Sequence, residues 1–315
     1  MTYKEYNTPM NVRELIDEFC DEKDAKPSTI ELYRKMLYLY VRWQSVNRLD
    51  IRKPTPAHLV KYKKFLLDER ERSARYVNVS FAALKQFYSW MDGKGYYHNI
   101  AREIKSVPVP EGFTRVPLMA ADVKKLIASI DSSTLSGVRD KALISLLFTC
   151  ALRLGEALSL RICDFDPQKE SLQVLGKARR QREYVQLTAD VSKLITHYLA
   201  LRADGKKPDD PLFAGHRRGL YSEIYASPLS TNTGVNIITH RLEKAGMKQK
   251  NVSAHSLRHG AACELVMAGN TLYEVSVFLR HRNLNISRIY TAYTERKLLN
   301  KNQPESILNS LIMTE

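Results

Sequence analysis

Residues 255–262 read HSLRHGAA, and this stretch decides how the second part of the chain is interpreted. Three basic side chains, His255, Arg258 and His259, stand within five positions, and a run that looks like a buried helix follows them. His255 and Arg258 lie three residues apart, so a helix places both on one face. Arginine and histidine both donate hydrogen bonds to oxygen atoms. The stretch therefore predicts a helix whose first turn holds a ligand rich in acceptor oxygens.

The sequence around this stretch predicts a mostly helical domain that carries a small sheet. Arg153 stands in CALRLGEALSL, where one hydrophobic helix turns into another. In SLQVLGKARRQREYVQL (171–187) two β-prone arms flank a basic connection, which predicts a hairpin. The segment AGHRRG (214–219) is interpreted as a solvated loop. Helices are predicted over 119–130, 137–160 and 188–202 and in the remainder of the chain, and a loop is predicted over 204–228.

The first third of the chain predicts four amphipathic helices. Ser28, with Glu31 three residues later, has the pattern of a capping box at a helix start. Thr55 followed by Pro56 is a second start signal, because proline is favoured in the first helical turn. Apolar side chains recur at helical spacing over 11–22, 28–44, 55–71 and 75–95, the last being ended by Gly93 and Gly95.

A proline-rich stretch separates these helices from the rest of the chain. SVPVPEGFTRVPL (106–118) holds three prolines and a glycine, which disfavour a helix and suit a linker. A chain of 315 residues also exceeds the usual size of one domain. The predicted division is a helical domain over 1–107, a linker over 108–118 and a second domain over 119–315.

Composition favours a nucleic-acid partner and excludes a membrane protein. The chain carries a net charge of +15, and its pI is about 9.6. Residues 1–113 hold 20 Lys and Arg against 15 Asp and Glu, so the excess does not come from one tail. An excess spread over both parts favours a polyanion. No signal peptide or bilayer-length apolar run is found, so we expect a soluble, cytoplasmic protein. Four widely separated cysteines indicate reduced thiols and no metal site.

Four segments of the second part contain residues whose chemical properties suit the same kind of ligand. Each alone is common: an arginine near a helix start usually forms a salt bridge, and a basic hairpin is usually solvated. Together, Arg153 and Arg258 are two fixed forks for the nonbridging oxygens of a phosphate. Histidines donate to such oxygens or move a proton, a lysine protonates a leaving alkoxide, and a tyrosine supplies a nucleophilic oxygen. The set of Arg153, Lys177, His255, Arg258, His281 and Tyr290 predicts a site for a phosphodiester in its transition state.

This order of residues resembles the tyrosine recombinase (phage-integrase) family, and the resemblance covers essentially the whole chain. LFTCALRLGEALSLRICDFD (147–166) looks like the first arginine box of the family, with Glu156 at its acidic position. HSLRHGAA and LRHRNLNISRIY (279–290) look like the second box, including the spacing from His281 to Tyr290. That spacing selects Tyr290 over Tyr293, which lies three residues further along.

The resemblance implies a mainly α fold, with an N-terminal four-helix core-binding domain and an α-rich catalytic domain with a small β-sheet. The two domains would form a C-shaped clamp around duplex DNA. The implied chemistry is attack by Tyr290 to give a 3′-phosphotyrosyl link and a free 5′-hydroxyl. A partner strand then reverses the link through a Holliday junction held by a homo-tetramer. Neither a metal nor another cofactor is implied.

The chain departs from the family pattern at three glycine positions. Ala151, Ala178 and Arg280 stand where the resemblance leads us to expect glycine. None of these changes removes a catalytic group, so activity is still expected. Arg280 adds a cation near the phosphate and is interpreted either as a DNA contact or as a surface residue. The other side chains interpreted as DNA contacts are Arg179, Arg180, Arg182 and His259.

Other functions share parts of this pattern. A non-catalytic DNA-binding regulator would explain the charge and the helices, but not Arg153, Lys177 and Tyr290 together. A type IB topoisomerase or a telomere resolvase would share the chemistry. Among recombinases, no arm-binding domain precedes residues 1–107, which favours a Xer-like dimer resolvase or a small mobile-element integrase. The target sequence and accessory proteins stay open, as does whether the C-terminal tail packs on its own domain or on a neighbouring subunit.

Overall fold

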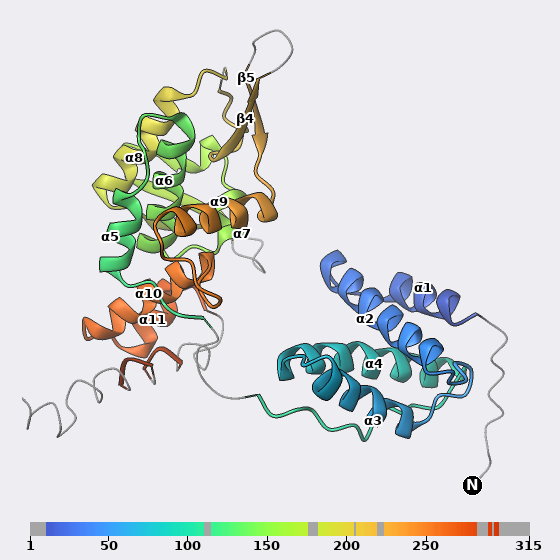
Figure 1. Cartoon of the computed structure of the whole chain (residues 1–315). Coiled ribbons are helices and arrows are strands. Elements are labelled where there is room, and N and C mark those ends of the chain that lie inside the picture. Colours follow the sequence, from blue (N-terminus) through green and yellow to red (C-terminus); the bar gives the residue numbers. More distant parts are fainter. Residues whose placement is uncertain are drawn as a thin grey trace, which may run out of the picture. The chain divides into compact units, whose positions relative to one another are not determined.

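The chain forms two compact units, Met1–Pro110 and Glu111–Glu315, and each is described by itself. Figure 1 colours the first unit in blues and teal and the second from green to red. No helix among the described residues is long and apolar enough to cross a membrane. This computed structural model describes residues 11–109, 115–175, 182–204, 206–218, 224–281, 289–291 and 293–295, with backbone alone at 216–218 and 224–226.

The first unit is a bundle of the four helices that the apolar spacing predicts. Aromatic side chains from different helices meet in its core: Phe19 lies 5.6 Å from Phe87, and Trp43 lies 5.1 Å from Tyr62, between ring centroids. Burial of these rings, more than helix propensity, stabilises such a bundle. The helices are α1 (Val12–Glu22), α2 (Pro27–Val46), α3 (Pro56–Lys64), which continues as a π-helical segment (Phe65–Glu69), and α4 (Ala74–Lys94).

Two of the predicted helix boundaries in this unit are confirmed and one is wrong. Thr55 caps α3 by accepting a hydrogen bond from the backbone N–H of His58. Helix α4 ends at Gly95, whose φ is 73°, whereas Gly93 lies inside the helix. A glycine serves there because this left-handed conformation is costly for other residues. The capping box predicted at Ser28 is absent, since α2 already begins at Pro27. The fixed φ of proline suits the first helical position and moves the start one residue earlier.

The second unit combines helices with small antiparallel sheets. The predicted hairpin over 171–187 is confirmed as β2 (Ser171–Leu175) paired with β3 (Arg182–Gln186). The short strand β1 (Phe165–Asp166) pairs with β2 and completes the sheet order β1-β2-β3. The helices are α5 (Ala120–Ala128), α6 (Leu135–Thr149), α7 (Leu154–Leu158), α8 (Ala189–Leu201), α9 (Thr231–Lys244), α10 (Ala254–Met267) and α11 (Leu272–Phe278), with a 3₁₀ turn over Ile162–Asp164.

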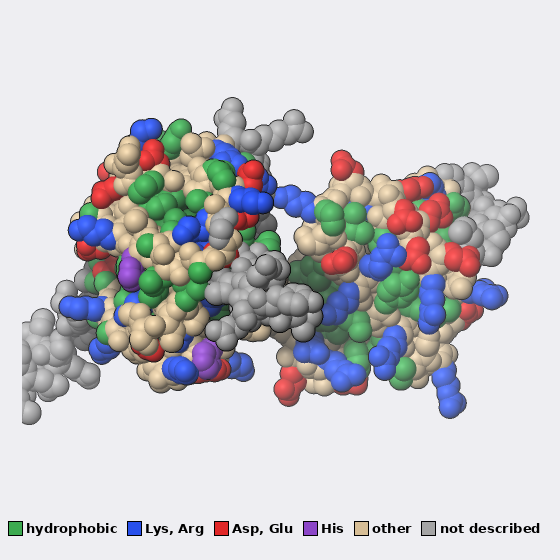
Figure 2. Space-filling view, turned by 90° about the horizontal axis from the view of Figure 1, so that it is seen from above, with side chains coloured by type: hydrophobic (Ala, Val, Ile, Leu, Met, Phe, Trp, Pro, Cys, Tyr) green, Lys and Arg blue, Asp and Glu red, His purple; other side chains and the backbone are tan. Residues whose placement is uncertain are grey.

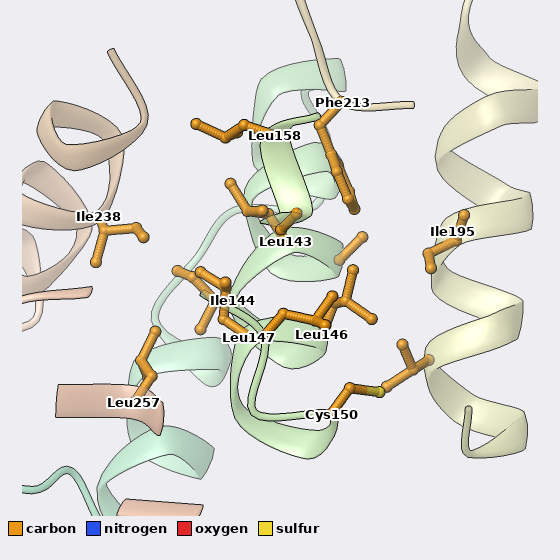
Figure 3. Close-up of a cluster of buried hydrophobic side chains, with 14 of the residues drawn as sticks. Leu143, Ile144, Leu146, Leu147, Cys150, Leu158, Ile195, Phe213, Ile238 and Leu257 are labelled. Atoms are coloured by element: carbon orange, nitrogen blue, oxygen red, sulfur yellow. The ribbon is translucent and has the colours of Figure 1, made fainter. Parts of the chain in front are cut away.

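Helix α6 lies at the centre of this unit. Its side chains are buried on all sides, which is the pattern of a helix surrounded by other elements. Figure 3 shows Ile195 of α8 on one side of α6, and Ile238 of α9 and Leu257 of α10 on the other. These three side chains and Leu143 and Ile144 of α6 are fully buried. The turn that leaves α6 is therefore fixed by the core of the unit.

The predicted loop over 204–228 is wrong in part, because it contains a β-hairpin. Strands β4 (Ala214–Arg218) and β5 (Ile224–Pro228) pair antiparallel, with Ala214 opposite Pro228 and Gly215 opposite Ser227. The interpretation of 214–219 as a solvated loop is likewise wrong for the strand residues. Glycine and proline are depleted in strands, so the sequence pattern pointed to a loop. A buried Ala214, whose carbonyl accepts a hydrogen bond from Arg139 at 3.0 Å, anchors the hairpin.

Helix α10, which begins one residue before HSLRHGAA, lies against the segment that enters the second unit. The backbone N–H of Leu118 donates to the carbonyl of Ser256 at 3.0 Å. Gly260 lets this segment approach, because a Cβ on it would lie 1.7 Å from the Leu118 carbonyl oxygen. The first turn of α10 is thereby held between α6 and the incoming chain.

Candidate active site

The turn between α6 and α7 presents Arg153. Helix α6 stops at Thr149, and Ala151 takes a left-handed φ of 45° that redirects the chain. The side chain of Glu156 then holds Arg153 at both ends: Oε2 accepts from the Arg153 backbone N–H at 2.9 Å, and Oε1 accepts from Nη1 at 2.6 Å. The Arg153 side chain stays 31% exposed, whereas that of Glu156 is 4% exposed. A buried carboxylate thus orients an arginine that can still reach a ligand.

The charge state of Glu156 follows from these contacts. Burial opposes its ionisation, but hydrogen bonds from Arg153 and the positive charges of Arg153 and Arg280 outweigh burial and lower the pKa of Glu156. The carboxylate is therefore ionised at neutral pH, and it partly offsets the positive charge of the arginines around it.

Arg258 is buried in the first turn of α10 and joins two segments of the site. Its Nη1 donates to the carbonyl of Ala151, and its Nη2 donates to the carbonyl of Leu279. Burial, and then the nearby charges of Arg153 and Arg280, lowers the pKa of Arg258 to about 10. The guanidinium still carries its charge at neutral pH, so the site holds a fixed cation with little water around it.

The next residue, His259, contacts Tyr290. Its Nδ1 lies 3.0 Å from the Tyr290 hydroxyl, and the two ring centroids are 5.6 Å apart. Burial, followed by the charges of His255 and Arg258, lowers the pKa of His259 to about 4. The imidazole is therefore neutral at physiological pH, and a neutral imidazole can accept a proton or a hydrogen bond.

Tyr290 itself is buried among the elements that surround this site. Its side chain belongs to a cluster with Ala262, Cys263 and Leu279, and 1% of the residue is exposed. Burial raises the pKa of its hydroxyl to about 12, although the charge of Arg258 acts in the opposite direction. The hydroxyl is therefore protonated in this state of the protein.

Two further histidines lie beside Tyr290 and His259. His281, which follows α11, stacks on Tyr290 with ring centroids 6.4 Å apart. Burial and the charges of Arg258 and Arg153 lower its pKa to about 4. His255 lies at the exposed start of α10, with its ring centroid 5.7 Å from that of His259. The imidazoles of His259 and His281, both neutral at physiological pH, therefore lie against Tyr290 from two segments of the chain.

Two of the side chains interpreted as DNA contacts have other partners in the structure. The guanidinium of Arg280 contacts backbone carbonyls of the α6–α7 turn, and its side chain is 12% exposed. Arg182 forms an ion pair with Asp164. The remaining hairpin residues of the predicted site, Lys177, Arg179 and Arg180, lie outside the described residues.

One residue near the site was not singled out in the sequence. Arg115 contacts Ser253, the residue that caps α10, and its charge contributes to the low pKa of His259. It stands in the proline-rich stretch that is typical of a linker, so no motif marks it. The predicted site residues that the structure gathers are Arg153, Glu156, His255, Arg258, His259, Arg280, His281 and Tyr290.

The family model of the phage integrase family matches residues 117–297, which include all of these residues. The chain belongs to the phage integrase family. It is similar to tyrosine recombinase XerD of Listeria monocytogenes, with 27% identity covering 91% of this chain and 96% of the relative. It is also similar to tyrosine recombinase XerC of Oceanobacillus iheyensis, with 29% identity covering 92% and 95%.

Solved structures of recombinases share the fold. The XerH site-specific recombinase bound to a palindromic difH substrate superposes with a TM-score of 0.71 at 20% identity, over 93% of this chain and 85% of that one. A lambda integrase dimer bound to a core site gives a TM-score of 0.68 at 14% identity, over 90% and 77%. The predicted family, the mainly α fold and the DNA breaking-and-rejoining activity are confirmed. This Xer-like tyrosine recombinase therefore catalyses site-specific recombination.

Proposed function

We propose that Tyr290 is the nucleophile of DNA strand cleavage and that Arg153 and Arg258 hold the scissile phosphate. The observation that carries this proposal is the position of Arg258, whose guanidinium contacts both the turn before Arg153 and the carbonyl of Leu279, just before His281. One buried cation thus connects the segments that supply Arg153 and His281. Arginine forks near a phosphate stabilise the charge that develops as the nucleophile attacks.

The proposed reaction forms one phosphate ester bond as it breaks another. The Tyr290 oxygen attacks phosphorus, the bond to the 5′-oxygen breaks, and a 3′-phosphotyrosyl link remains. Lys177 gives a proton to the leaving 5′-oxygen, and the Tyr290 proton passes to a neutral imidazole, for which His259 stands within reach. The 5′-hydroxyl of a partner strand then attacks the link and releases Tyr290. The phosphotyrosyl bond keeps the energy of the broken bond, so rejoining needs no external energy source.

The remaining histidines are proposed to donate to the phosphate. His281 has a pKa of about 4, so it acts as a neutral donor at physiological pH. His255 lies on the exposed side of the same helical turn as Arg258. Glu156 supports them by orienting Arg153, and it does not touch the substrate in this scheme.

Cleavage also requires a change in the position of Tyr290. Its side chain is almost fully buried, and an in-line attack needs the hydroxyl within contact distance of the phosphorus. We propose that DNA binding draws Tyr290 out of the cluster around Cys263 and Leu279.

The first unit is proposed to bind the DNA on which the second unit acts. Figure 2 shows Lys and Arg side chains on the visible faces of both units, and both parts of the sequence carry excess positive charge. We therefore propose residues 1–107 as the core-binding domain, 108–118 as the linker and 119–315 as the catalytic domain. Four copies would assemble on paired recombination sites and pass through a Holliday junction.

The XerC and XerD relatives match over nearly their whole lengths, which supports a Xer-like role. Within that role, resolution of DNA dimers and movement of a small genetic element use the same chemistry. Sequencing the DNA that the protein binds in cells would distinguish them: one site per replicon indicates dimer resolution, and sites at the ends of an inserted element indicate mobility.

The nucleophile is tested by trapping the covalent adduct. The probe is the tightest-binding duplex recovered from a random-sequence pool with the wild-type protein, nicked beside its cleavage position. Tyr290→Phe should abolish the adduct and leave binding nearly intact, because only the attacking oxygen is lost. Tyr293→Phe, the matched control, should still form it. Peptide mapping that finds DNA on Tyr293 would overturn the assignment.

A further inference from the structure

The guanidinium of Arg280 is directed into the protein and fastens two segments of the site. Its Nη2 donates to the carbonyls of Cys150 at 3.2 Å and Ala151 at 3.1 Å, and its Nη1 donates to the carbonyl of Phe278 at 3.1 Å. The same nitrogen Nη2 lies 3.7 Å from Glu156 Oε2. With these contacts and only 12% exposure, the Arg280 side chain connects the α6–α7 turn to the segment that precedes His281.

The backbone at both ends of this tie is strained. Arg280 has a φ of 53° and Ala151 a φ of 45°, both in the left-handed region that glycine adopts most easily. Such strain persists only where the surroundings hold the residue in place. The Arg280 guanidinium is one of the groups that do so, because it binds the carbonyl of Ala151 while its own backbone carries the second strained angle.

The partners of Arg280 are also partners of the two phosphate-binding arginines. The Ala151 carbonyl accepts from both Arg280 and Arg258, and Glu156 contacts both Arg280 and Arg153. A displacement of either partner would move a guanidinium relative to the phosphate. Errors of about 1 Å in such positions can reduce a rate about a hundredfold.

We propose that Arg280 is a positioning residue for cleavage: it sets the places of Arg153 and Arg258 through Glu156 and the Ala151 carbonyl, and it does not bind DNA. The proposal rests on the proposed function, in which those two arginines hold the scissile phosphate. It also accounts for an arginine at a position where the family resemblance leads one to expect glycine.

The test compares Arg280→Gly with a matched control. Glycine relieves the strained φ and removes the guanidinium, so folding should be little affected. Glu170→Gly relieves a similar φ of 47° in the turn between β1 and β2. With the nicked duplex described above at saturating protein, Arg280→Gly should form the Tyr290 adduct about tenfold to a hundredfold more slowly. Its affinity in a gel shift should match that of the wild type, and Glu170→Gly should match it in both measurements.

A second readout separates positioning from general structural support. Arg280 and His281 line an open groove between β3 and α11, so a small solute can reach the vacated space. Low millimolar guanidinium chloride should therefore restore adduct formation by Arg280→Gly in a saturable way, with no effect on the wild type. Arg280→Lys, which keeps the charge without the fork, should be intermediate and serves as the deciding variant if Arg280→Gly does not fold.

Three outcomes would overturn the proposal. One is adduct formation by Arg280→Gly at the wild-type rate. Another is a loss of DNA affinity as large as the loss of cleavage, which would make Arg280 a docking residue. The third is a slow variant that guanidinium does not rescue. Failure of the proposed function looks different, since the wild type would then give no adduct, or an adduct that Tyr290→Phe retains.

Discussion

Arg258 affects the candidate site both through its hydrogen bonds and through its charge. Two of its nitrogens bind carbonyls of different segments, and its charge contributes to the pKa values of His259, His281 and Tyr290. A lysine in its place has one nitrogen on a flexible stem, so it cannot reproduce the planar fork. The geometry of this residue is therefore as important as its charge.

The change Arg258→Lys should slow cleavage far more than it weakens binding. Loss of one preorganised donor at a charged transition state commonly costs about 10² to 10³ in rate. Binding to duplex DNA depends on many phosphate contacts, so a gel shift should move little. Arg182→Lys is the control, because Arg182 is 45% exposed and pairs with Asp164. A fall in affinity as large as the fall in cleavage would instead identify Arg258 as a docking residue.

The partly buried histidines His259 and His281 predict a pH dependence of stability. The pKa values of His259 and His281 fall from 6.5 to about 4 on folding, first because of burial. Between these values the unfolded chain binds more protons than the folded chain, so the free energy of unfolding decreases as the pH falls. The stability that the neutral histidines contribute is complete above pH 6.5, and it is lost as the pH falls towards 4.

The measurement is the melting temperature at about pH 7 and about pH 5, the window set by this linkage. The melting temperature of the wild type should fall more between the two pH values than that of His259→Gln. The glutamine keeps a polar group near Tyr290 but does not titrate. Equal losses in both proteins would show that His259 is not the titrating group.

The sequence selected candidate residues for the site, and the contacts among those that the structure describes did not all follow from it. The order and spacing of the boxes selected Arg153, Arg258, His281 and Tyr290, and the structure gathers the segments that carry them. The contact of His259 with Tyr290 spans 31 residues, and no local pattern reports such a distance. The inward direction of the Arg280 side chain goes with a left-handed backbone. A residue other than glycine gives no sequence signal for that conformation.

For helices and strands, local sequence signals predicted the structure well where apolar spacing or proline decided it. Four helices of the first unit and the β2–β3 hairpin followed from such signals. The β4–β5 hairpin did not, because Gly215 and Pro228 stand in its strands and both residue types are usually depleted from strands. The apolar run 137–160 breaks at Cys150 in the structure, and the break is held by the carbonyl contacts of Arg258 and Arg280.

The close contact between α10 and the backbone at Leu118 predicts the effect of a substitution at Gly260. Gly260→Ala would put a methyl group 1.7 Å from the Leu118 carbonyl oxygen, so either helix α10 or the backbone at Leu118 must shift. Overpacking of this kind costs about 1–3 kcal/mol or more in the free energy of unfolding, measured by urea denaturation. Gly155→Ala in α7 is the matched control, since a Cβ on Gly155 would meet nothing within 4 Å. An unchanged midpoint for Gly260→Ala would show that the contact with Leu118 is easily relaxed.

At the scale of the whole molecule, the charge is shared between the two parts of the chain. Residues 1–113 carry an excess of positive charge, and so does the remainder. Electrostatic attraction to phosphates therefore acts on both units, and affinity should fall steeply with salt for the full chain. Binding strength alone therefore says little about the catalytic site, which is why each test of cleavage measures affinity beside it.

The C-terminal tail is a candidate for contacts between copies of the chain. Ile307, Leu308, Leu311 and Ile312 recur at helical spacing, and they lie outside the described residues. A stripe this short is not stable alone in water and needs a surface to cover it. If that surface belongs to a neighbouring copy, deletion from Glu305 onward should leave single-site binding intact and weaken the paired complex in a two-site gel shift. Leu308→Asp should act in the same way, whereas Asn309→Asp, off the stripe, should not. A lower melting temperature of the free protein with normal pairing would place the tail on its own domain instead.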